Sequence, residues 1–168
     1  NTGIGIKKFV HPNDLSDADK AYDASRIEAK YAPDIRYAEI LLNYAEALNE
    51  AEGPTAEVYN AVNKIRRRAQ LLDLPANLTK DEMRNKIRQE RRVELAFENH
   101  RFWDVRRWKI AEIVDNKKVH KITVNADGTY SYPVFQNRVF DKAKHYLFPI
   151  PQSEIDKNRN LVQNPGWN

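Results

Sequence analysis

The sequence contains no cysteine, which excludes a disulfide framework and a thiolate metal site. Glycine is scarce, at five residues in 168. No apolar run approaches the roughly 20 residues that a membrane-spanning helix needs. The N-terminus has no initiator methionine and neither the basic nor the apolar segment of a signal peptide. We therefore expect a piece of a longer protein or a processed product, whose missing targeting signals say little about location.

The amino-acid composition is typical of a soluble globular protein with many helices. Hydrophobic residues make up 41% of the chain and charged residues 31%, and the charged residues are rich in Lys, Arg and Glu. The length predicts a single domain over residues 1–168, long enough to bury a core. The net charge of +4 is mild and mixed in sign, so it is weak evidence for a polyanionic partner.

An amphipathic helix is predicted over residues 35–52. Apolar residues repeat every four and three positions, and polar residues repeat in the same way on the opposite face. The two stripes are Tyr37, Leu41, Tyr44, Leu48 and Ala51, and Arg36, Glu39, Asn43, Glu46 and Glu50. Gly53 and Pro54 end this helix, and Thr55 is the expected N-cap of a second one over residues 55–71. So short a connection makes the two helices antiparallel neighbours, as in a tetratricopeptide-type hairpin.

Two more helices complete the predicted helical part. Thr79 and Glu82 have the spacing of a capping box, which opens a third helix over residues 79–98. A tryptophan-rich fourth helix is expected over residues 102–114.

A small amount of β-structure is expected beside the helices. The run Asn125-Ala126-Asp127-Gly128 separates two β-prone segments and predicts a β-hairpin at residues 119–135. A short strand is expected to end at Lys7–Val10, and residues 146–168 are expected to form an irregular tail with one short helical turn. The predicted fold class is therefore mainly α, with a tetratricopeptide-like helical hairpin, further helices and a small β-hairpin.

Charged residues fall on the apolar face of the third helix. The spacing that places Met83 and Ile87 on that face also places Glu90, Glu94 and Phe97 there. Buried carboxylates are costly unless they are paired, and a guanidinium can hold a carboxylate with two parallel hydrogen bonds. Nearby arginines, including Arg92, are the expected partners. We predict a structural ion-pair network formed by Glu90, Arg91, Glu94, Arg101, Asp104, Arg106 and Arg107.

A catalytic role for these carboxylates has less support in the sequence than a role in structural ion pairs. A carboxylate–histidine metal site would involve Glu98 and His100, but their spacing does not match the Glu-x-x-His pairs of two-metal bundles. A glycosidase needs two carboxyls across an open cleft, whereas Glu90 and Glu94 lie one turn apart on a packed face. Nucleophile motifs and glycine-rich phosphate loops are also absent from the sequence. We expect no enzymatic activity, no metal and no cofactor.

A nucleic-acid partner is also weighed and not expected. Residues 84–109 contain nine cations and four anions, a net charge of +5, with Phe102, Trp103 and Trp108 among them. Basic and aromatic surfaces do bind single strands. Here, however, a carboxylate lies within one or two turns of nearly every arginine, and this pattern favours internal pairing over phosphate binding.

Four separated motifs resemble those of the SusD/RagB family, in the same order. The first is the run RYAEILLNYAEALNE at residues 36–50, and the second is IRRRA at residues 65–69. The third joins ERRVELAFE at residues 90–98 to RFWDVRRW at residues 101–108. The fourth joins LFPIPQSEI to QNPGW near the end of the chain. The resemblance extends over nearly the whole sequence.

This resemblance implies a location and a role that the spacing alone does not show. SusD-like proteins are lipid-anchored on the outer face of the outer membrane in Bacteroidetes-type bacteria, and they are not enzymes. They bind glycans, or in some members peptides, and lie as a lid on a SusC-like TonB-dependent transporter. The chain resembles the C-terminal part of such a protein, without the lipidated cysteine. The implied function is non-catalytic nutrient capture in an outer-membrane uptake complex.

Aromatic residues of the hairpin are the candidate ligand-binding residues. Tyr130, Tyr132 and Phe135 could stack on the face of a sugar ring if they are exposed. The alternative, that these rings pack the hairpin onto the helices, remains open. Trp103 and Trp108 are expected to close the core. A second functional hypothesis is a helical-hairpin scaffold that makes only protein–protein contacts.

Overall fold

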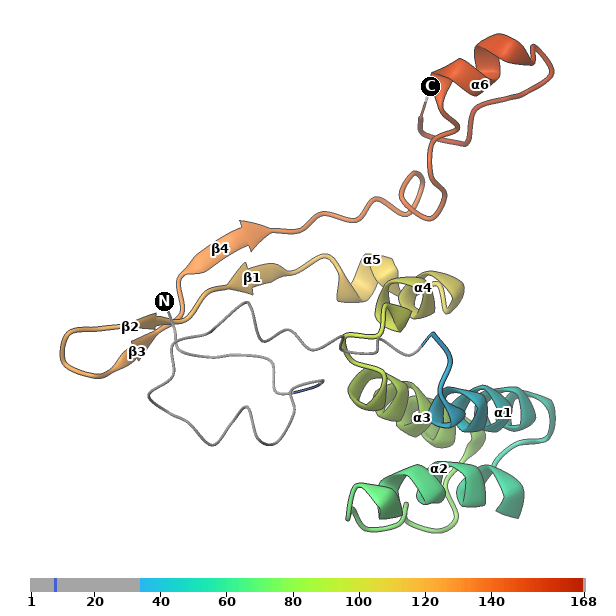
Figure 1. Cartoon of the computed structure of the whole chain (residues 1–168), viewed down its shortest axis with the longest axis vertical. Coiled ribbons are helices and arrows are strands. Elements are labelled where there is room, and N and C mark those ends of the chain that lie inside the picture. Colours follow the sequence, from blue (N-terminus) through green and yellow to red (C-terminus); the bar gives the residue numbers. More distant parts are fainter. Residues whose placement is uncertain (1–7, 9–33, 168) are drawn as a thin grey trace, which may run out of the picture. The chain divides into compact units, whose positions relative to one another are not determined.

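The computed structural model describes residue 8 and residues 34–167 (Figure 1). These residues fall into two compact units, one within residues 6–101 and the other within residues 102–168. Helices account for 46% of the structure, which confirms the mainly α fold class. The single domain expected over residues 1–168 stays a prediction. The strand expected at Lys7–Val10 lies outside the described residues, except for Lys8 in a turn.

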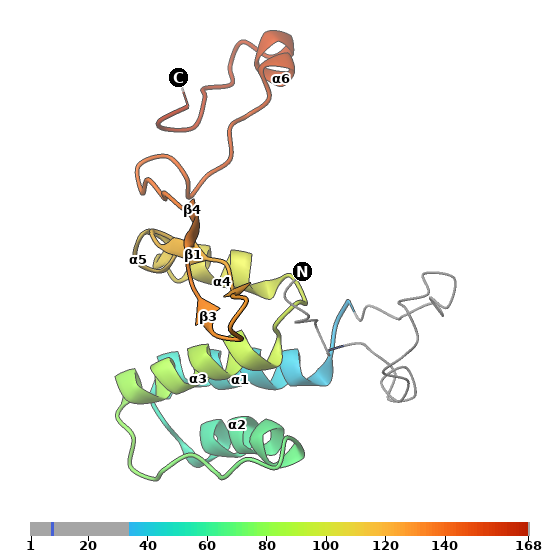
Figure 2. The ribbon, with the colours of Figure 1, turned by 90° about the vertical axis from the view of Figure 1, so that its left-hand side faces the viewer.

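The first unit contains three helices: α1 (Tyr37–Glu52), α2 (Ala56–Arg68) and α3 (Lys80–Glu94). α1 packs against both of the others (Figures 1 and 2). Gly53, at a φ of 92°, ends α1 and donates its N–H to the Asn49 carbonyl at 2.9 Å. Thr55 takes the predicted N-cap position of α2, but its side chain makes no cap hydrogen bond.

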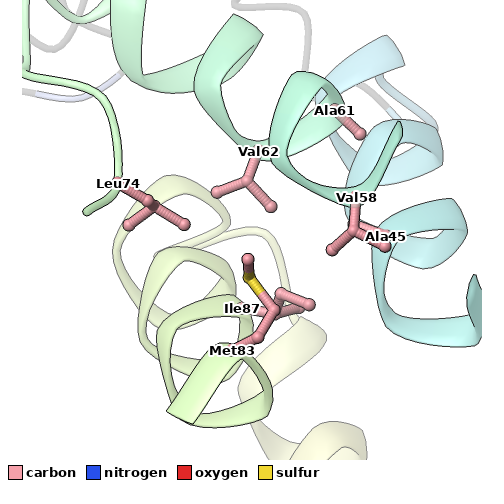
Figure 3. Packing of buried hydrophobic residues seen from close by; sticks show 7 residues of the cluster. All are labelled: Ala45, Val58, Ala61, Val62, Leu74, Met83 and Ile87. Atoms are coloured by element: carbon pink, nitrogen blue, oxygen red, sulfur yellow. The ribbon is translucent and has the colours of Figure 1, made fainter. Parts of the chain in front are cut away.

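The core of this unit is an apolar cluster that all three helices share (Figure 3). It consists of Ala45, Val58, Ala61, Val62, Leu74, Met83 and Ile87. Small side chains at Ala45 and Ala61 let α1 and α2 approach closely. Leu74 comes from the loop after α2, where its N–H donates to the Asn63 Oδ1 at 2.9 Å.

The buried face of α1 is offset from the predicted apolar stripe. Leu42, Ala45 and Asn49 are buried, whereas Tyr37 and Tyr44 of the predicted stripe are 62% and 49% exposed. The sequence period indicates that a helix is amphipathic, but α1 has two neighbours on different sides. Its buried face is therefore the one that both neighbours cover.

The start of α3 matches the prediction, and its end does not. The Thr79 N–H donates to the Glu82 Oε2 at 2.8 Å and the Glu82 N–H donates to the Thr79 Oγ1 at 3.3 Å, which confirms the capping box. α3 ends at Glu94 and does not continue to residue 98. Phe97 and Asn99 both have a φ of 64°, which a right-handed helix cannot contain. Phe97 is consequently 66% exposed and does not complete the apolar face.

The predicted helix over residues 102–114 is two helices, α4 (His100–Arg107) and α5 (Ala111–Val114). Lys109, with a φ of 53°, separates them. The second unit has its own small core, in which Val105 of α4 and Ala111 of α5 pack against Phe140. The two short helices meet through this core.

The tail contains one short helix, α6 (Gln152–Lys157), and is otherwise irregular, as predicted. Two reciprocal hydrogen bonds close the loop around α6: the Ile150 N–H donates to the Gln163 Oε1 at 2.8 Å, and the Gln163 Nε2 donates to the Ile150 carbonyl at 2.9 Å. The Trp167 indole donates to the Lys144 carbonyl at 3.1 Å. Across the described part of the chain, every helix is too short or too polar to cross a membrane.

Candidate functional site

Two short pairs of antiparallel strands form the predicted hairpin. β1 (Lys118–His120) pairs with β4 (Val134–Asn137), and β2 (Thr123–Val124) pairs with β3 (Tyr130–Ser131). These strands extend slightly beyond the predicted residues 119–135, up to Asn137. The hairpin is therefore confirmed.

The turn at the tip of the hairpin is held by its own polar groups. The Gly128 N–H donates to the Asn125 carbonyl at 3.0 Å, and Gly128 has a φ of 81°. The Asp127 Oδ1 accepts hydrogen bonds from the Thr129 hydroxyl at 2.7 Å and from the Thr129 N–H at 3.0 Å. These hydrogen bonds hold the pKa of the Asp127 carboxyl below its usual value. The tip is thus pre-organised by local interactions.

The three predicted aromatic residues of this hairpin are exposed. Tyr130 is 61% exposed, Tyr132 60% and Phe135 69%. Phe135 lies where the strand register shifts: Val119 pairs with Gln136 while His120 pairs with Val134. It is the extra residue of a bulge, a feature that redirects a side chain. In the described residues each of the three rings is thus mostly open to solvent.

Polar groups lie beside these rings. Lys118 and Lys121 have exposed side chains on the first half of the hairpin. The His120 Nδ1 lies 2.7 Å from the Tyr132 carbonyl oxygen, and the Lys121 N–H donates to the Pro133 carbonyl at 3.1 Å. These contacts to the backbone hold the short segment between β3 and β4 that carries Tyr132. The exposed ring and the two lysines therefore belong to the same hairpin.

The predicted network carboxylates on α3 find their partners on other elements. The Glu90 Oε2 accepts a hydrogen bond from the Arg66 Nη1 on α2 at 2.8 Å. The two Glu94 oxygens accept from the Arg68 Nη2 at 2.8 and 2.7 Å, and Glu94 also binds the Arg36 Nη1 at 3.0 Å. The sequence placed these partners among Arg91, Arg92 and the arginines that follow, because it cannot show which helices lie side by side.

Arg36, just before α1, is the centre of a second group of charges that the sequence interpretation missed. Its Nε and Nη2 donate to the two Glu98 oxygens at 2.7 and 2.8 Å. Lys8 also forms an ion pair with Glu98, whose side chain is only 4% exposed. The hydrogen bonds to Glu98 raise the pKa of Arg36 above its usual value. These contacts join α1 to the segment that follows α3.

The remaining predicted network residues have separate surroundings. Arg91 is buried, donates to the Asn43 Oδ1 at 2.6 Å and lies 3.9 Å from Glu46. Asp104 is buried and accepts from the Arg107 Nε at 2.9 Å.

Arg106 differs from the other members of the predicted network in its surroundings. The Arg106 guanidinium lies over the Phe102 ring, 3.5 Å from its centroid, where a carboxylate was expected. Burial lowers the pKa of Arg106, and Asp115 partly offsets this effect. Arg101 is half-buried.

Trp103 does not close the core as predicted. It is 59% exposed and touches Phe102 edge-on at 5.0 Å, and Phe102 stacks on Phe148 at 6.0 Å. The three rings form an exposed aromatic cluster in the second unit. Its only signal in the sequence was the pair of adjacent aromatics on a short helix. Trp108 is half-buried.

Metal binding has little support in the described residues. Across residue 8 and residues 34–167, no three side chains of His, Asp or Glu gather where they could hold an ion. His100, which was considered as a ligand, lies 3.6 Å from Glu39. This pair joins Glu39 of α1 to His100 at the start of α4.

The buried carboxylate of Glu98 makes the unfolding free energy depend on pH. Burial opposes its ionisation, but hydrogen bonds from Arg36 and Lys8 outweigh this effect and lower its pKa below the ordinary 4.5. Glu50, bonded to Arg84, is shifted in the same direction. At neutral pH both groups are ionised in the folded and unfolded states, so their contribution is fully present. Below about pH 4.5 the unfolded chain takes up protons first, and stability falls.

We therefore expect the urea midpoint to be flat between pH 7 and pH 5.5 and to fall as the pH drops below about 4.5. Glu98→Gln cannot take up this proton, so its midpoint should fall less steeply over the same range. Circular dichroism at a series of pH values measures both slopes. Equal slopes for the variant and the wild type would show that folding does not lower the pKa of Glu98.

Known proteins with similar sequences are SusD-like. The model of the SusD family matches residues 1–167. SusD-like protein P2 from Formosa agariphila is 38% identical over 145 residues, which cover 82% of this chain and 26% of that protein.

Solved structures give the same result. A SusD-like protein from Bacteroides fragilis matches with a TM-score of 0.73 and 38% identity, over 80% of this chain and 25% of that one. A SusD homolog from Bacteroides thetaiotaomicron matches with a TM-score of 0.60 and 35% identity, over 79% and 26%. The chain thus spans about a quarter of the length of these relatives.

Proposed function

The chain belongs to the SusD family, and from this membership we propose that it takes part in non-catalytic glycan capture within a SusD-like outer-membrane uptake complex. The observation that carries the proposal is the group of exposed rings at Tyr130, Tyr132 and Phe135. Aromatic side chains that are open to solvent on a pre-organised hairpin can stack on a flat apolar surface, such as the face of a pyranose.

The chemistry of these rings suits a sugar. A tyrosine offers an apolar face and a hydroxyl on one rigid side chain, so little conformational entropy is lost on binding. The exposed ammonium groups of Lys118 and Lys121 can donate hydrogen bonds to sugar hydroxyls from the same ribbon. A ligand would therefore be held by stacking and a few polar contacts.

The pairing of two carboxylates on α3 supports the non-catalytic part of the proposal. Glu90 and Glu94, which lie one turn apart, both accept hydrogen bonds from arginines. A paired carboxylate at a packed helix interface can neither donate a proton to a glycosidic oxygen nor activate a water. The α3 carboxylates therefore hold helices together.

The partner and the location belong to the same proposal. A SusC-like TonB-dependent transporter is the expected partner, and a lipid anchor outside this chain is the expected link to the outer membrane. Both come from the family resemblance. Co-purification of the SusC-like protein with a tagged full-length polypeptide tests the partnership, and a transporter-free eluate from detergent-solubilised outer membranes would contradict it.

Single substitutions in the hairpin test glycan binding. We expect Tyr130→Ala or Tyr132→Ala to weaken the Kd for a captured glycan about tenfold or more, equivalent to about 1.4 kcal/mol. Each variant removes one stacking face and leaves the strand pairing intact. Affinity electrophoresis against a glycan panel identifies a ligand, and isothermal titration calorimetry measures its Kd.

Phe97→Ala is the matched control, because Phe97 is an equally exposed ring, at 66%, outside the hairpin. Equal loss of affinity in Phe97→Ala and Tyr130→Ala would remove the hairpin from the proposal. If the protein binds no glycan in the panel, the capture proposal fails and a scaffold that makes only protein contacts takes its place. Release of reducing sugar by the purified protein would overturn the non-catalytic assignment.

A further inference from the structure

The hairpin of the candidate site carries an excess of positive charge. Residues 117–138 contain four cationic side chains and one acidic side chain, a net charge of +3. The cations are Lys117, Lys118, Lys121 and Arg138, and all four are exposed. The rest of the chain contains 24 cationic and 23 acidic side chains, a net charge of +1. Most of the formal charge of +4 therefore belongs to the segment that also carries the exposed tyrosines.

The hairpin cations differ from the arginines of the helices in having no acidic neighbour. Arg66, Arg68 and Arg84 each bind a carboxylate of another helix. Among the residues that the structure describes, no carboxylate forms an ion pair with any of the four hairpin cations. The single acid of the hairpin, Asp127, accepts its hydrogen bonds from Thr129 within the turn. The positive charge of the hairpin is therefore open to a partner from solution.

Two of these cations lie directly opposite each other at the end of the hairpin away from the turn. The register that pairs Lys118 with Asn137 continues to Lys117 and Arg138, and the Arg138 N–H donates to the Lys117 carbonyl at 3.1 Å. Side chains at opposite positions share one face of a strand pair, and like charges there are destabilising. An anionic group held between the two side chains would contact both and offset their repulsion.

The cations and the exposed tyrosines lie on one continuous ribbon, in which the β1–β4 pair is followed by the β2–β3 pair (Figure 1). Val124, which pairs with Tyr130, lies six residues after Lys118. At the rise of a β-strand this separation is about 20 Å. A single monosaccharide cannot span it, whereas a polysaccharide can stack on the tyrosines and extend to the cations.

We propose that the ligand of this hairpin is an anionic polysaccharide, whose sugars carry carboxylate or sulfate groups. The proposal rests on the capture function proposed for the same residues and adds the charge of the ligand to it. The tyrosine rings stack on sugar faces, and Lys117 and Arg138 hold an acidic group between them. A neutral glycan would leave these opposed cations without a counter-charge.

Pairs of polysaccharides that differ only in charge test the class of ligand. Polygalacturonate and its methyl ester differ in the carboxylate, and ι-carrageenan and its desulfated form differ in the sulfate. Isothermal titration calorimetry of the full-length polypeptide is run in about 0.1 M and about 1 M NaCl, where charges are screened beyond about 10 Å and about 3 Å. We expect the charged member of one pair to bind about tenfold or more tighter at the lower salt concentration, and to lose most of this advantage at the higher one. The pair that shows the effect identifies the acidic group.

The double variant Lys117→Gln/Arg138→Gln removes the opposed charges and keeps the tyrosines. We expect its Kd for the charged polysaccharide to rise about tenfold and to depend less on salt. Its melting temperature should not fall, because the substitutions remove a repulsion. Lys86→Gln, at an exposed lysine of α3, is the matched control and should leave the Kd unchanged. Tyr130→Ala should weaken binding without changing its salt dependence.

The possible failures of this proposal and of glycan capture give different results. Equal affinity for the charged and neutral members of both pairs, or binding of neutral glycans alone, would overturn the anionic ligand and leave glycan capture in place. An equal loss in Lys86→Gln and in the double variant would also overturn it, because the net charge of the whole chain would then explain binding. Binding of no polysaccharide in either charge state would overturn both proposals. A single-stranded oligonucleotide that binds as tightly as the charged polysaccharide would reassign the surface to nucleic acid.

Discussion

Arg36→Ala is expected to lower the free energy of unfolding by about 2–4 kcal/mol. Arg36 binds both oxygens of Glu98 and one oxygen of Glu94. These carboxylates are only 4% and 11% exposed, so water cannot replace the lost donors. In the variant, Lys8 still pairs with Glu98 and Arg68 still pairs with Glu94. Arg36 is also a quarter exposed. For both reasons the expected loss of unfolding free energy is smaller than for a fully buried ion pair. Urea denaturation followed by circular dichroism measures the change.

Arg67→Ala is the matched control for this variant. Arg67 also binds a carboxylate through two nitrogens, but its partner Asp73 is 41% exposed and Arg67 is 63% exposed. Exposed ion pairs contribute little, because water and salt solvate the separated charges. We expect a melting temperature close to that of the wild type. If Arg36→Ala and Arg67→Ala unfold alike, burial does not set the value of these ion pairs and the structural role of Arg36 is lost.

Arg36→Lys separates charge from geometry in the same cluster. Lysine keeps the positive charge but cannot hold two carboxylates with a planar fork. We expect a stability between those of the wild type and Arg36→Ala. This intermediate value would show that Arg36 acts as a bidentate bridge between Glu94 and Glu98.

Local features were predictable from the sequence because they depend on near neighbours. The capping box needs only Thr79 and Glu82, three residues apart, and the hairpin turn needs only a glycine that accepts a positive φ at Gly128. The end of α1 at Gly53 is a feature of the same kind. Such signals lie within a few residues of the structure that they determine.

Pairing across elements was not predictable. The sequence showed that Glu90 and Glu94 would need arginines, but Arg66, Arg68 and Arg36 lie 24 to 58 positions away. Which of the many arginines serves each carboxylate depends on how α2 and α1 lie against α3. A periodic pattern on a single helix contains no such information.

The sequence period also did not show which side of α1 is buried. Of the predicted apolar stripe, Leu41 and Leu48 pack against the core, whereas Tyr37 and Tyr44 are exposed. The fully buried positions are Leu42 and Ala45, outside that stripe. The period was therefore right and the buried face is rotated from the predicted stripe, because apolar residues occupy more than half of the circumference of α1. Excess apolar surface of this kind is itself a signal that a helix has several neighbours.

Met83→Ala is expected to reduce the free energy of unfolding by about 2–5 kcal/mol, the usual cost of removing a large buried side chain. Met83 is completely buried and points with Ile87 toward Val62 and Val58 (Figure 3). Removing it leaves a cavity where α3 meets α2, and the small side chains already present at this contact cannot move in to fill it. The urea midpoint of the purified chain gives the value.

Val93→Ala controls for the loss of an apolar side chain from the same helix, because Val93 is 62% exposed. Its effect should stay within about 0.5 kcal/mol, as for most surface substitutions. The difference between the two variants isolates the contribution of the shared core from helix propensity. If Met83→Ala were as stable as Val93→Ala, α2 and α3 would not share a packed core, and the placement of α3 in this unit would have to be abandoned.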